Sequence, residues 1–186
     1  MRKVLASLAA LALVSGVASA QLQWIGASAV YHVEGDTWYG ANADWASAFQ
    51  GEDFGVVSTL TLGAEVQTWD QGAGTVVEMG ININPFGDTL NPIFAGWLDL
   101  PYLEPAGNND KWQNTTGVDI AAGLPVGEHT VSVFFRATRD DGASYVWDSN
   151  GGANYTAAFE IVPEPSTLLL GGMGLVGLLI ARRRKA

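Results

Sequence analysis

The chain has 186 residues, no cysteine and a formal net charge of −10. Its length suits one domain with a core of its own, and the lack of cysteine excludes disulfides, thiolate catalysis and cysteine metal sites. The acidic balance argues against a nucleic-acid partner, because it repels phosphate backbones.

The N-terminus has the three parts of a secretory signal peptide. Two cations precede an apolar run over residues 4–17, and the small residues Ala18 and Ala20 follow as signal peptidase requires. We therefore expect residues 1–20 to be a signal peptide that is removed by cleavage after Ala20. An uncleaved N-terminal anchor is the alternative that these small residues disfavour.

Residues 21–162 have the pattern of an all-β domain. Alternating and β-branched runs are bounded by Gly, Asn, Asp and Pro, which predicts an antiparallel β-sandwich of about eight strands. The expected strands are Gln23–Val33, Gly55–Trp69, Thr75–Asn84, Ile93–Leu98, Gly117–Ala121, Glu128–Arg139, Ser144–Trp147 and Tyr155–Val162. Residues 36–54 lack clear alternation, so we expect a long loop or an edge region there.

Two turns are expected to close hairpins. Residues 70–74 contain two glycines, which tolerate positive φ, and residues 140–143 form a similar Asp-Asp-Gly-Ala turn. In the strand 128–139, alternation places Val131, Val133, Phe135 and Ala137 on one face, and we expect it to be the core face. Phe134 then lies on the opposite face among polar neighbours.

A segment near the end of the domain combines aromatic rings with amides and a carboxylate. It runs from Tyr145 to Thr156 and resembles the Trp-Asp-Asn-Asn-Gly-Gly-x-Asn-Tyr stretch of starch- and glycogen-binding modules, with Ser in place of the first Asn. The resemblance implies a carbohydrate site formed by Trp147, Asp148, Asn150, Asn154 and Tyr155. Rings pack on the C–H faces of sugars, and amides and carboxylates bind hydroxyls.

Three alternatives concern these and neighbouring residues. Trp112, with Asn109 and Lys111, has the same mixture of side chains and is a further carbohydrate-binding candidate by composition. The 148–154 segment also fits a plain tight turn, in which Asp and Asn bond to the backbone. A calcium site would use Asp140, Asp141, Asp148 and Asn150, although their spacing does not match an EF-hand loop.

Nothing in the sequence indicates catalysis. The two histidines, His32 and His129, each lie in an expected strand and match no zinc or triad pattern. We therefore expect no enzyme activity, no cofactor and no metal centre.

The C-terminus combines a short proline motif, an apolar run and a basic end. Pro163, Glu164 and Pro165 precede a charge-free run over residues 166–181, and residues 182–186 are basic through Arg182, Arg183, Arg184 and Lys185. As a helix the run would span roughly 24 Å, slightly less than a hydrocarbon core of about 30 Å. The cations would hold its end in the cytoplasm.

This order of parts resembles the PEP-CTERM sorting signal of Gram-negative bacteria, here over residues 163–186. The resemblance implies recognition by an exosortase, a transient membrane tether through the 166–181 helix, and delivery to the cell surface or the extracellular matrix. An ordinary membrane anchor is the alternative.

Without the two ends, the exported part is strongly acidic. From Gln21 to Pro165 it has three cations against nineteen acids, a net charge of −16. We expect a structural component of the surface matrix, with a carbohydrate-binding module for a glucan or exopolysaccharide as the alternative. Signal peptidase and exosortase are the expected processing partners, and polysaccharide is the ligand of the alternative.

Overall fold

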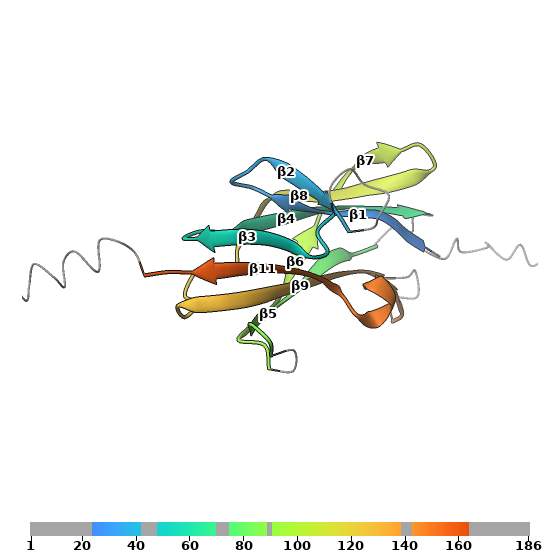
Figure 1. The fold of residues 1–186 in the computed structure, drawn as a ribbon. Coiled ribbons are helices and arrows are strands. Elements are labelled where there is room, and N and C mark those ends of the chain that lie inside the picture. The colour runs from blue at the N-terminus through green and yellow to red at the C-terminus, as the bar shows by residue number, and fades with distance from the viewer. Residues whose placement is uncertain (1–23, 42–47, 70–74, 89–90, 139–142, 164–186) are drawn as a thin grey trace, which may run out of the picture.

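The structure is a computed structural model that describes residues 24–41, 48–69, 75–88, 91–138 and 143–163. Over these residues the chain forms eleven strands and one short 3-10 helix, arranged in two sheets that pack against each other (Figure 1). This confirms the predicted β-sandwich.

The first sheet has the strand order β2-β1-β4-β8-β7, and every neighbouring pair is antiparallel. Its strands are β1 (Trp24–His32), β2 (Thr37–Gly40), β4 (Thr61–Trp69), β7 (Tyr102–Ala106) and β8 (Asn109–Asp119). The hairpin of β7 and β8 projects from one corner of the sandwich (Figure 1).

The second sheet has the order β3-β11-β9-β5-β6, with β10 paired to the last part of β9. Its strands are β3 (Glu52–Val57), β5 (Val77–Pro85), β6 (Phe94–Leu100), β9 (Gly127–Thr138), β10 (Tyr145–Asp148) and β11 (Tyr155–Ile161). Its pairs are antiparallel except β3 with β11, which run parallel.

The core lies between the two sheets and follows the alternation of the strands. On β9, Val131, Val133, Phe135 and Ala137 are all fully buried, whereas the residues between them are partly exposed. The prediction of the core face of this strand is confirmed. Other large and fully buried apolar side chains of the core come from both sheets and their connections, namely Phe49, Leu60, Leu62, Met79, Ile81, Ile83 and Phe159.

Several expected strand boundaries are wrong. The single strand expected at Gly55–Trp69 is two strands, because the chain leaves β3 in one sheet and enters β4 in the other through residues 58–60. Of the strand expected at Gly117–Ala121, residues 117–119 are the last part of the longer β8, and residues 120 and 121 follow it. The loop expected at 36–54 contains β2 and the start of β3.

One of the two expected hairpins is wrong. Strands β4 and β5 lie in different sheets, so the segment between them crosses the sandwich, and its residues 70–74 lie outside the described residues. The other hairpin is confirmed by the pairing of Thr138 with Tyr145 between β9 and β10. Its turn at 139–142 also lies outside the described residues.

The two ends of the described domain lie at opposite ends of the sandwich (Figure 1). The predicted signal peptide 1–20 and the predicted membrane helix 166–181 lie outside the described residues. Within the part of the chain that the structure describes, no helix has the length and apolarity needed to cross a membrane.

Candidate functional site

The structure places the two predicted sugar-binding rings on different sides of the second sheet. Trp147 lies on the outer face of β10 and is 50% exposed. Tyr155 begins β11 and points into the core, where it is 5% exposed. Of the two rings, Trp147 is the one that can meet a ligand from solvent.

Asp148 binds the protein itself with both carboxylate oxygens. Oδ1 accepts a hydrogen bond from the Tyr155 hydroxyl at 2.5 Å, and Oδ2 accepts one from the Ser28 hydroxyl at 2.5 Å. Burial, followed by the hydrogen bond to the Asp148 carboxylate, raises the pKa of Tyr155. The carboxylate therefore joins β10, β11 and the first sheet.

The two predicted amides shape the turn between β10 and β11. Asn150 and Asn154 both have positive φ, of 50° and 59°, and the Asn150 side chain donates to the Asn154 carbonyl oxygen at 3.1 Å. Asn tolerates this left-handed backbone better than most residues. The contacts of these amides are those of the tight-turn interpretation.

Trp112 lies in the first sheet and is not brought together with Trp147. It is 8% exposed, and its indole N–H donates to the Thr68 hydroxyl at 2.8 Å. Its neighbours are also occupied, since Lys111 lies 3.6 Å from both Glu65 and Glu104. Asn109 donates to the Gln67 side-chain oxygen at 3.4 Å.

The residues of the calcium alternative are not gathered by the described part of the chain. Asp140 and Asp141 lie outside the described residues, and the Asp148 carboxylate is occupied by Ser28 and Tyr155. Among the residues that the structure describes, no group of three or more His, Asp or Glu side chains could hold a metal ion.

A cluster of aromatic rings lies on the outer face of the second sheet around Trp147. Its rings are those of Trp97 on β6, Phe134 on β9, and Tyr145 and Trp147 on β10. Together with the Arg136 side chain on β9, we call this cluster the aromatic platform. Trp97 is 44% exposed and Tyr145 is 37% exposed. Alternation along β9 predicts that Phe134 lies on this face, but it does not identify the other rings beside it.

The rings of the platform lean toward one another across β5 and β9. Strands β6 and β10 are separated by β5 and β9, which corresponds to three interstrand spacings or roughly 14 Å. The ring centroids of Trp97 and Trp147 are nevertheless only 6.4 Å apart. Phe134 fills the space between them, with centroids 5.2 Å from Trp97 and 6.2 Å from Trp147.

Gly80 on β5 makes this close approach possible. It pairs with Trp97 on one side and Phe134 on the other, so it occupies the middle of the platform. A Cβ atom at this position would lie 2.4 Å from atoms of the Phe134 ring. The glycine therefore leaves the space that the phenylalanine ring occupies.

Arg136 is enclosed between two rings and a carboxylate. Its guanidinium carbon lies 3.6 Å from the ring centroid of Trp97 and 4.8 Å from that of Tyr145. Its Nε donates to Glu78 Oε2 at 2.6 Å, and both side chains are largely buried. A stacked guanidinium is attracted by the ring faces, and the ion pair fixes its plane.

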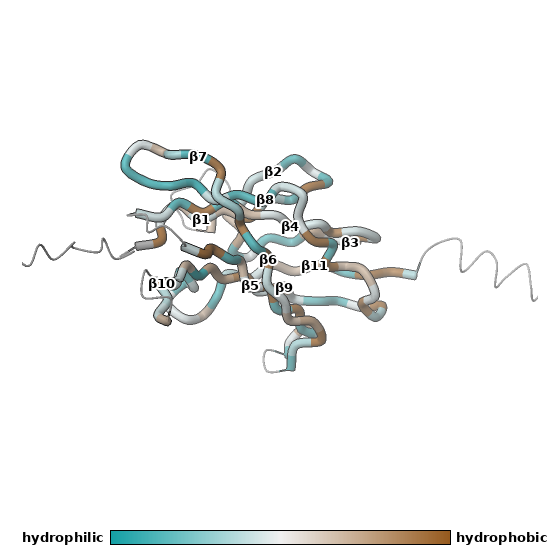
Figure 2. Tube along the Cα trace, turned by 180° about the vertical axis from the view of Figure 1, so that it is seen from behind, coloured by the Kyte–Doolittle hydropathy of each residue, from teal (hydrophilic) through white to brown (hydrophobic). Residues whose placement is uncertain are grey.

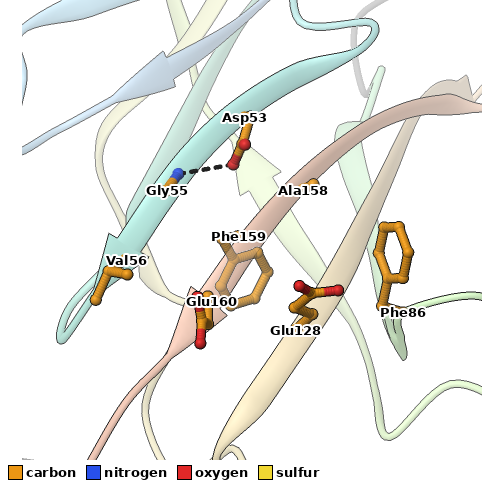
Figure 3. Close-up of a pocket in the computed structure, with 8 residues that line it drawn as sticks. All are labelled: Asp53, Gly55, Val56, Phe86, Glu128, Ala158, Phe159 and Glu160. Carbon is orange, nitrogen blue, oxygen red and sulfur yellow. Dashed lines mark hydrogen bonds between the residues drawn. The ribbon is translucent and has the colours of Figure 1, made fainter.

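A second surface feature is a hollow of about 250 Å³ near the end of β11 (Figure 3). Glu128 and Glu160 lie side by side in it, and Phe86 lies beyond Glu128. Asp53 accepts a hydrogen bond from the Gly55 N–H at 2.8 Å (Figure 3). The hollow is acidic and lies at the end of the domain from which the C-terminal segment leaves.

Both histidines have contacts typical of structural residues. His32 lies 3.2 Å from Glu34, whose carboxylate also accepts from the Thr61 backbone N–H at 2.9 Å. His129 is buried against Phe159, and its Nε2 lies 2.8 Å from the Pro125 carbonyl oxygen.

The family model described as the PEP-CTERM protein-sorting motif matches residues 162–185. This confirms the sorting signal expected from Pro163, Glu164, Pro165 and the arginines. The match indicates an exported protein that is a substrate of exosortase. Of the motif, Val162 and Pro163 are within the described residues, and the remainder lies outside them.

Comparison with solved structures gives a similarity to the structure of the CooA pilin subunit from enterotoxigenic Escherichia coli. The two chains are 14% identical, and the match covers 74% of this chain and 100% of that chain, with a TM-score of 0.29. No curated protein matches the chain significantly.

Proposed function

We propose that this chain, a carrier of the PEP-CTERM sorting motif, is a structural and non-enzymatic component of the cell surface or extracellular matrix of a Gram-negative bacterium. The observation that carries the proposal is the position of the motif. It begins at Val162, immediately after β11 ends at Ile161. A folded sandwich is thus followed directly by its sorting signal.

Export requires two processing steps in this proposal. Signal peptidase removes residues 1–20 after Ala20, and the 166–181 segment then holds the domain outside the inner membrane until exosortase cuts near Pro163. The arginines at 182–184 stay cytoplasmic, because positive residues set the orientation of a span. The sandwich leaves the membrane when the tail is removed.

The structural role is supported by how the domain is held together. The described residues form two sheets around one continuous apolar core, and Asp148 links the sheets through buried hydroxyls. Both histidines contact structural partners. Turnover of a polysaccharide by the purified protein would contradict a non-enzymatic role.

The mass of the protein isolated from cells tests the processing steps. We expect the loss of residues 1–20 and a new C-terminus near Pro163, in material recovered from the surface or matrix. A mature protein that retains Arg182–Arg184 and stays in the inner membrane would contradict removal of the tail. A protein that retains residues 1–20 in the cytoplasm would contradict export.

A second candidate function is carbohydrate binding, which the exposure of Trp147 favours. The ring is half-exposed on a sheet face beside two other exposed aromatic residues, Trp97 and Tyr145. Tyr155, Asp148, Asn150 and Asn154 contribute to the fold through the contacts described above. A sugar site at Trp147 therefore requires partners other than those expected from the sequence.

A further inference from the structure

We propose that the aromatic platform is a binding surface for a neutral, non-crystalline polysaccharide chain. The site is the outer sheet face over β6, β5, β9 and β10, and it differs from the 148–154 turn that the sequence indicates. The inference rests on the second candidate function above and is independent of export and processing.

Three aromatic rings of the platform are exposed to solvent. Trp97, Tyr145 and Trp147 are each more than one third exposed, and all three belong to one patch. Large aromatic side chains are usually covered in a monomeric domain. Their gathering on one face indicates that a ligand covers them.

Hydrogen-bonding groups lie beside the rings of the platform. Arg136 and Glu78 lie in the same row across the sheet as Trp147, and Asp99 of β6 pairs with Glu78 at the end of that row. A sugar presents C–H faces to rings and hydroxyls that both donate and accept. Asp99 is exposed, so its carboxylate can accept from a sugar hydroxyl, whereas Arg136 and Glu78 are largely occupied by each other.

The charge of the domain favours a neutral ligand over anionic ones. The only cation of the platform is Arg136, and it is paired with Glu78. The region 21–165 carries a net charge of −16, so anionic polysaccharides, anionic lipids and a second copy of the chain are all repelled. A neutral polysaccharide pays no such electrostatic cost.

The tilts of the rings restrict the shape of the ligand. The ring of Trp147 is tilted by 55° from Trp97, by 33° from Phe134 and by 52° from Tyr145. Rings with these tilts cannot all lie flat on one plane. They fit a single curved chain better than the flat face of a crystalline polysaccharide.

Affinity electrophoresis of the full chain tests the proposal, in a polyoxyethylene detergent that has no sugar headgroup. The probes are glycogen, a soluble β-glucan and alginate in the gel, with sedimentation on microcrystalline cellulose as a separate arm. We expect retardation by at least one neutral soluble glucan and none by alginate. Trp97→Ala and Trp147→Ala should each weaken binding by about tenfold.

Matched variants separate the platform from other surfaces. Trp69→Ala removes an equally exposed ring, 53% exposed, on the first sheet, so it should leave binding unchanged. Asn154→Gly preserves positive φ in the turn but removes its amide, and it should also leave binding unchanged. The thermal unfolding midpoint of each variant shows that it is folded, and Trp147→Ala decides if Trp97→Ala does not fold.

Several results would overturn the proposal. If neither neutral glucan retards the protein, the platform is not a glucan-binding site. If Trp69→Ala weakens binding as much as the platform variants do, binding is not located on the platform. If Asn154→Gly loses binding and Trp97→Ala does not, the binding site lies at the turn between β10 and β11. Strong binding to crystalline cellulose contradicts the curved ligand, and a wild-type dimer that Trp97→Ala dissociates assigns the face to a second copy. The mass of the cellular protein reports processing separately from all of these.

Discussion

The Ser28 hydroxyl donates a hydrogen bond to Oδ2 of Asp148 at 2.5 Å, across 120 positions of sequence and between the two sheets. The register of β1 shifts between Gly26 and Ala29, and Ala27 within the shift has a φ of 47°. Such a bulge re-aims the side chains next to it. Here it accompanies a fully buried serine that contacts the strand β10.

We predict that this contact is a main determinant of stability. Ser28→Ala removes a hydrogen bond to a carboxylate and should lower the free energy of unfolding by about 2 kcal/mol. Asp148→Ala removes the acceptor of both Ser28 and Tyr155 and should cost about 3 kcal/mol, because two buried hydroxyls lose their partner. Urea denaturation of the purified chain measures both effects.

Ser58→Ala is the matched control for this prediction. Ser58 is exposed in the connection between β3 and β4, and its substitution should change the free energy of unfolding by no more than about 0.5 kcal/mol. Equal effects of Ser28→Ala and Ser58→Ala would show that the link between the sheets contributes little.

The stability of the domain should fall at alkaline pH through Tyr155. The folded state raises the pKa of this hydroxyl through burial and its bond to Asp148. The contribution is fully present below the ordinary tyrosine pKa of about 10. It is lost as pH rises further, because the unfolded chain releases its proton first.

Thermal unfolding midpoints between pH 8 and 11 measure this dependence. Tyr155→Phe should flatten the alkaline decline, whereas Tyr102→Phe, at a half-exposed position, should leave the decline as it is. Part of the decline should persist in Tyr155→Phe, because the pKa values of Tyr31 and Tyr39 are also raised. An identical decline in wild type and Tyr155→Phe would contradict the assignment.

The sequence predicted the sheet faces better than the sheet order. Alternation on β9 identified its buried residues, because a period of two is a local property. The glycines at 70–74 predict a hairpin, whereas β4 and β5 lie in different sheets. A glycine-rich turn permits a reversal but does not determine which strand becomes the neighbour.

Strand β7 and the first part of β8, which the sequence does not predict, lack the alternating apolar pattern of a strand. β8 begins with Asn109, Asp110 and Lys111, and its first part is coloured as hydrophilic in Figure 2. β7 contains Pro105, which is tolerated because β7 is an edge strand. These strands are held by pairing with β4 and with each other, which no local pattern reports.

The candidate site shows the same limit. The sequence indicates Trp147, but its ring partner Trp97 comes from β6, which is distant in sequence, and Phe134 comes from the neighbouring strand β9. Tyr155 and Trp112 have the same residue types as a sugar site and are nevertheless buried. Residue type alone does not distinguish an exposed ring from a core ring, whereas the register of β5, β6, β9 and β10 does.

Gly80 should be required for the shape of the platform. Gly80→Ala places a methyl group 2.4 Å from the Phe134 ring, so the ring must move, and the substitution should cost about 1–3 kcal/mol. In Gly80→Ala/Phe134→Ala the clash is absent, and the double variant should be more stable than the sum of the single effects implies. Urea denaturation of the four proteins gives this coupling.

Gly63→Ala is the control for this double-mutant cycle of Gly80 and Phe134. Its methyl group would lie 2.3 Å from the Asn114 carbonyl oxygen, which belongs to the backbone of β8 and cannot rotate away. It should cost more than Gly80→Ala, and Phe134→Ala should not relieve it. Additive effects of Gly80→Ala and Phe134→Ala would show that Phe134 does not occupy the space above Gly80.

The processing step should depend on the residues before the predicted membrane helix. Replacing Pro163, Glu164 and Pro165 together by Ala removes the motif that the resemblance assigns to exosortase, and the uncut chain should accumulate in the inner membrane. Lys185→Ala, at the far end of the basic segment, is the control and should be processed normally. Mass spectrometry of membrane and surface fractions separates the two forms. Normal processing of the triple variant would mean that the Pro-Glu-Pro sequence is only a linker.

Neither Lys nor Met should replace Arg136 without a loss of stability. Arg136→Lys keeps the charge near Glu78 but loses the planar group that stacks on Trp97, and a flexible ammonium does not hold both contacts together. Because the Glu78 side chain is largely buried, Arg136→Met should be the more destabilising variant, leaving that carboxylate without its partner at a cost of about 3 kcal/mol. Arg136→Met/Glu78→Gln removes both charges and should recover most of the loss, as measured by urea denaturation. If the double variant is as unstable as Arg136→Met, then the stacking of the guanidinium between Trp97 and Tyr145, and not the ion pair, is what Arg136 contributes to the sheet.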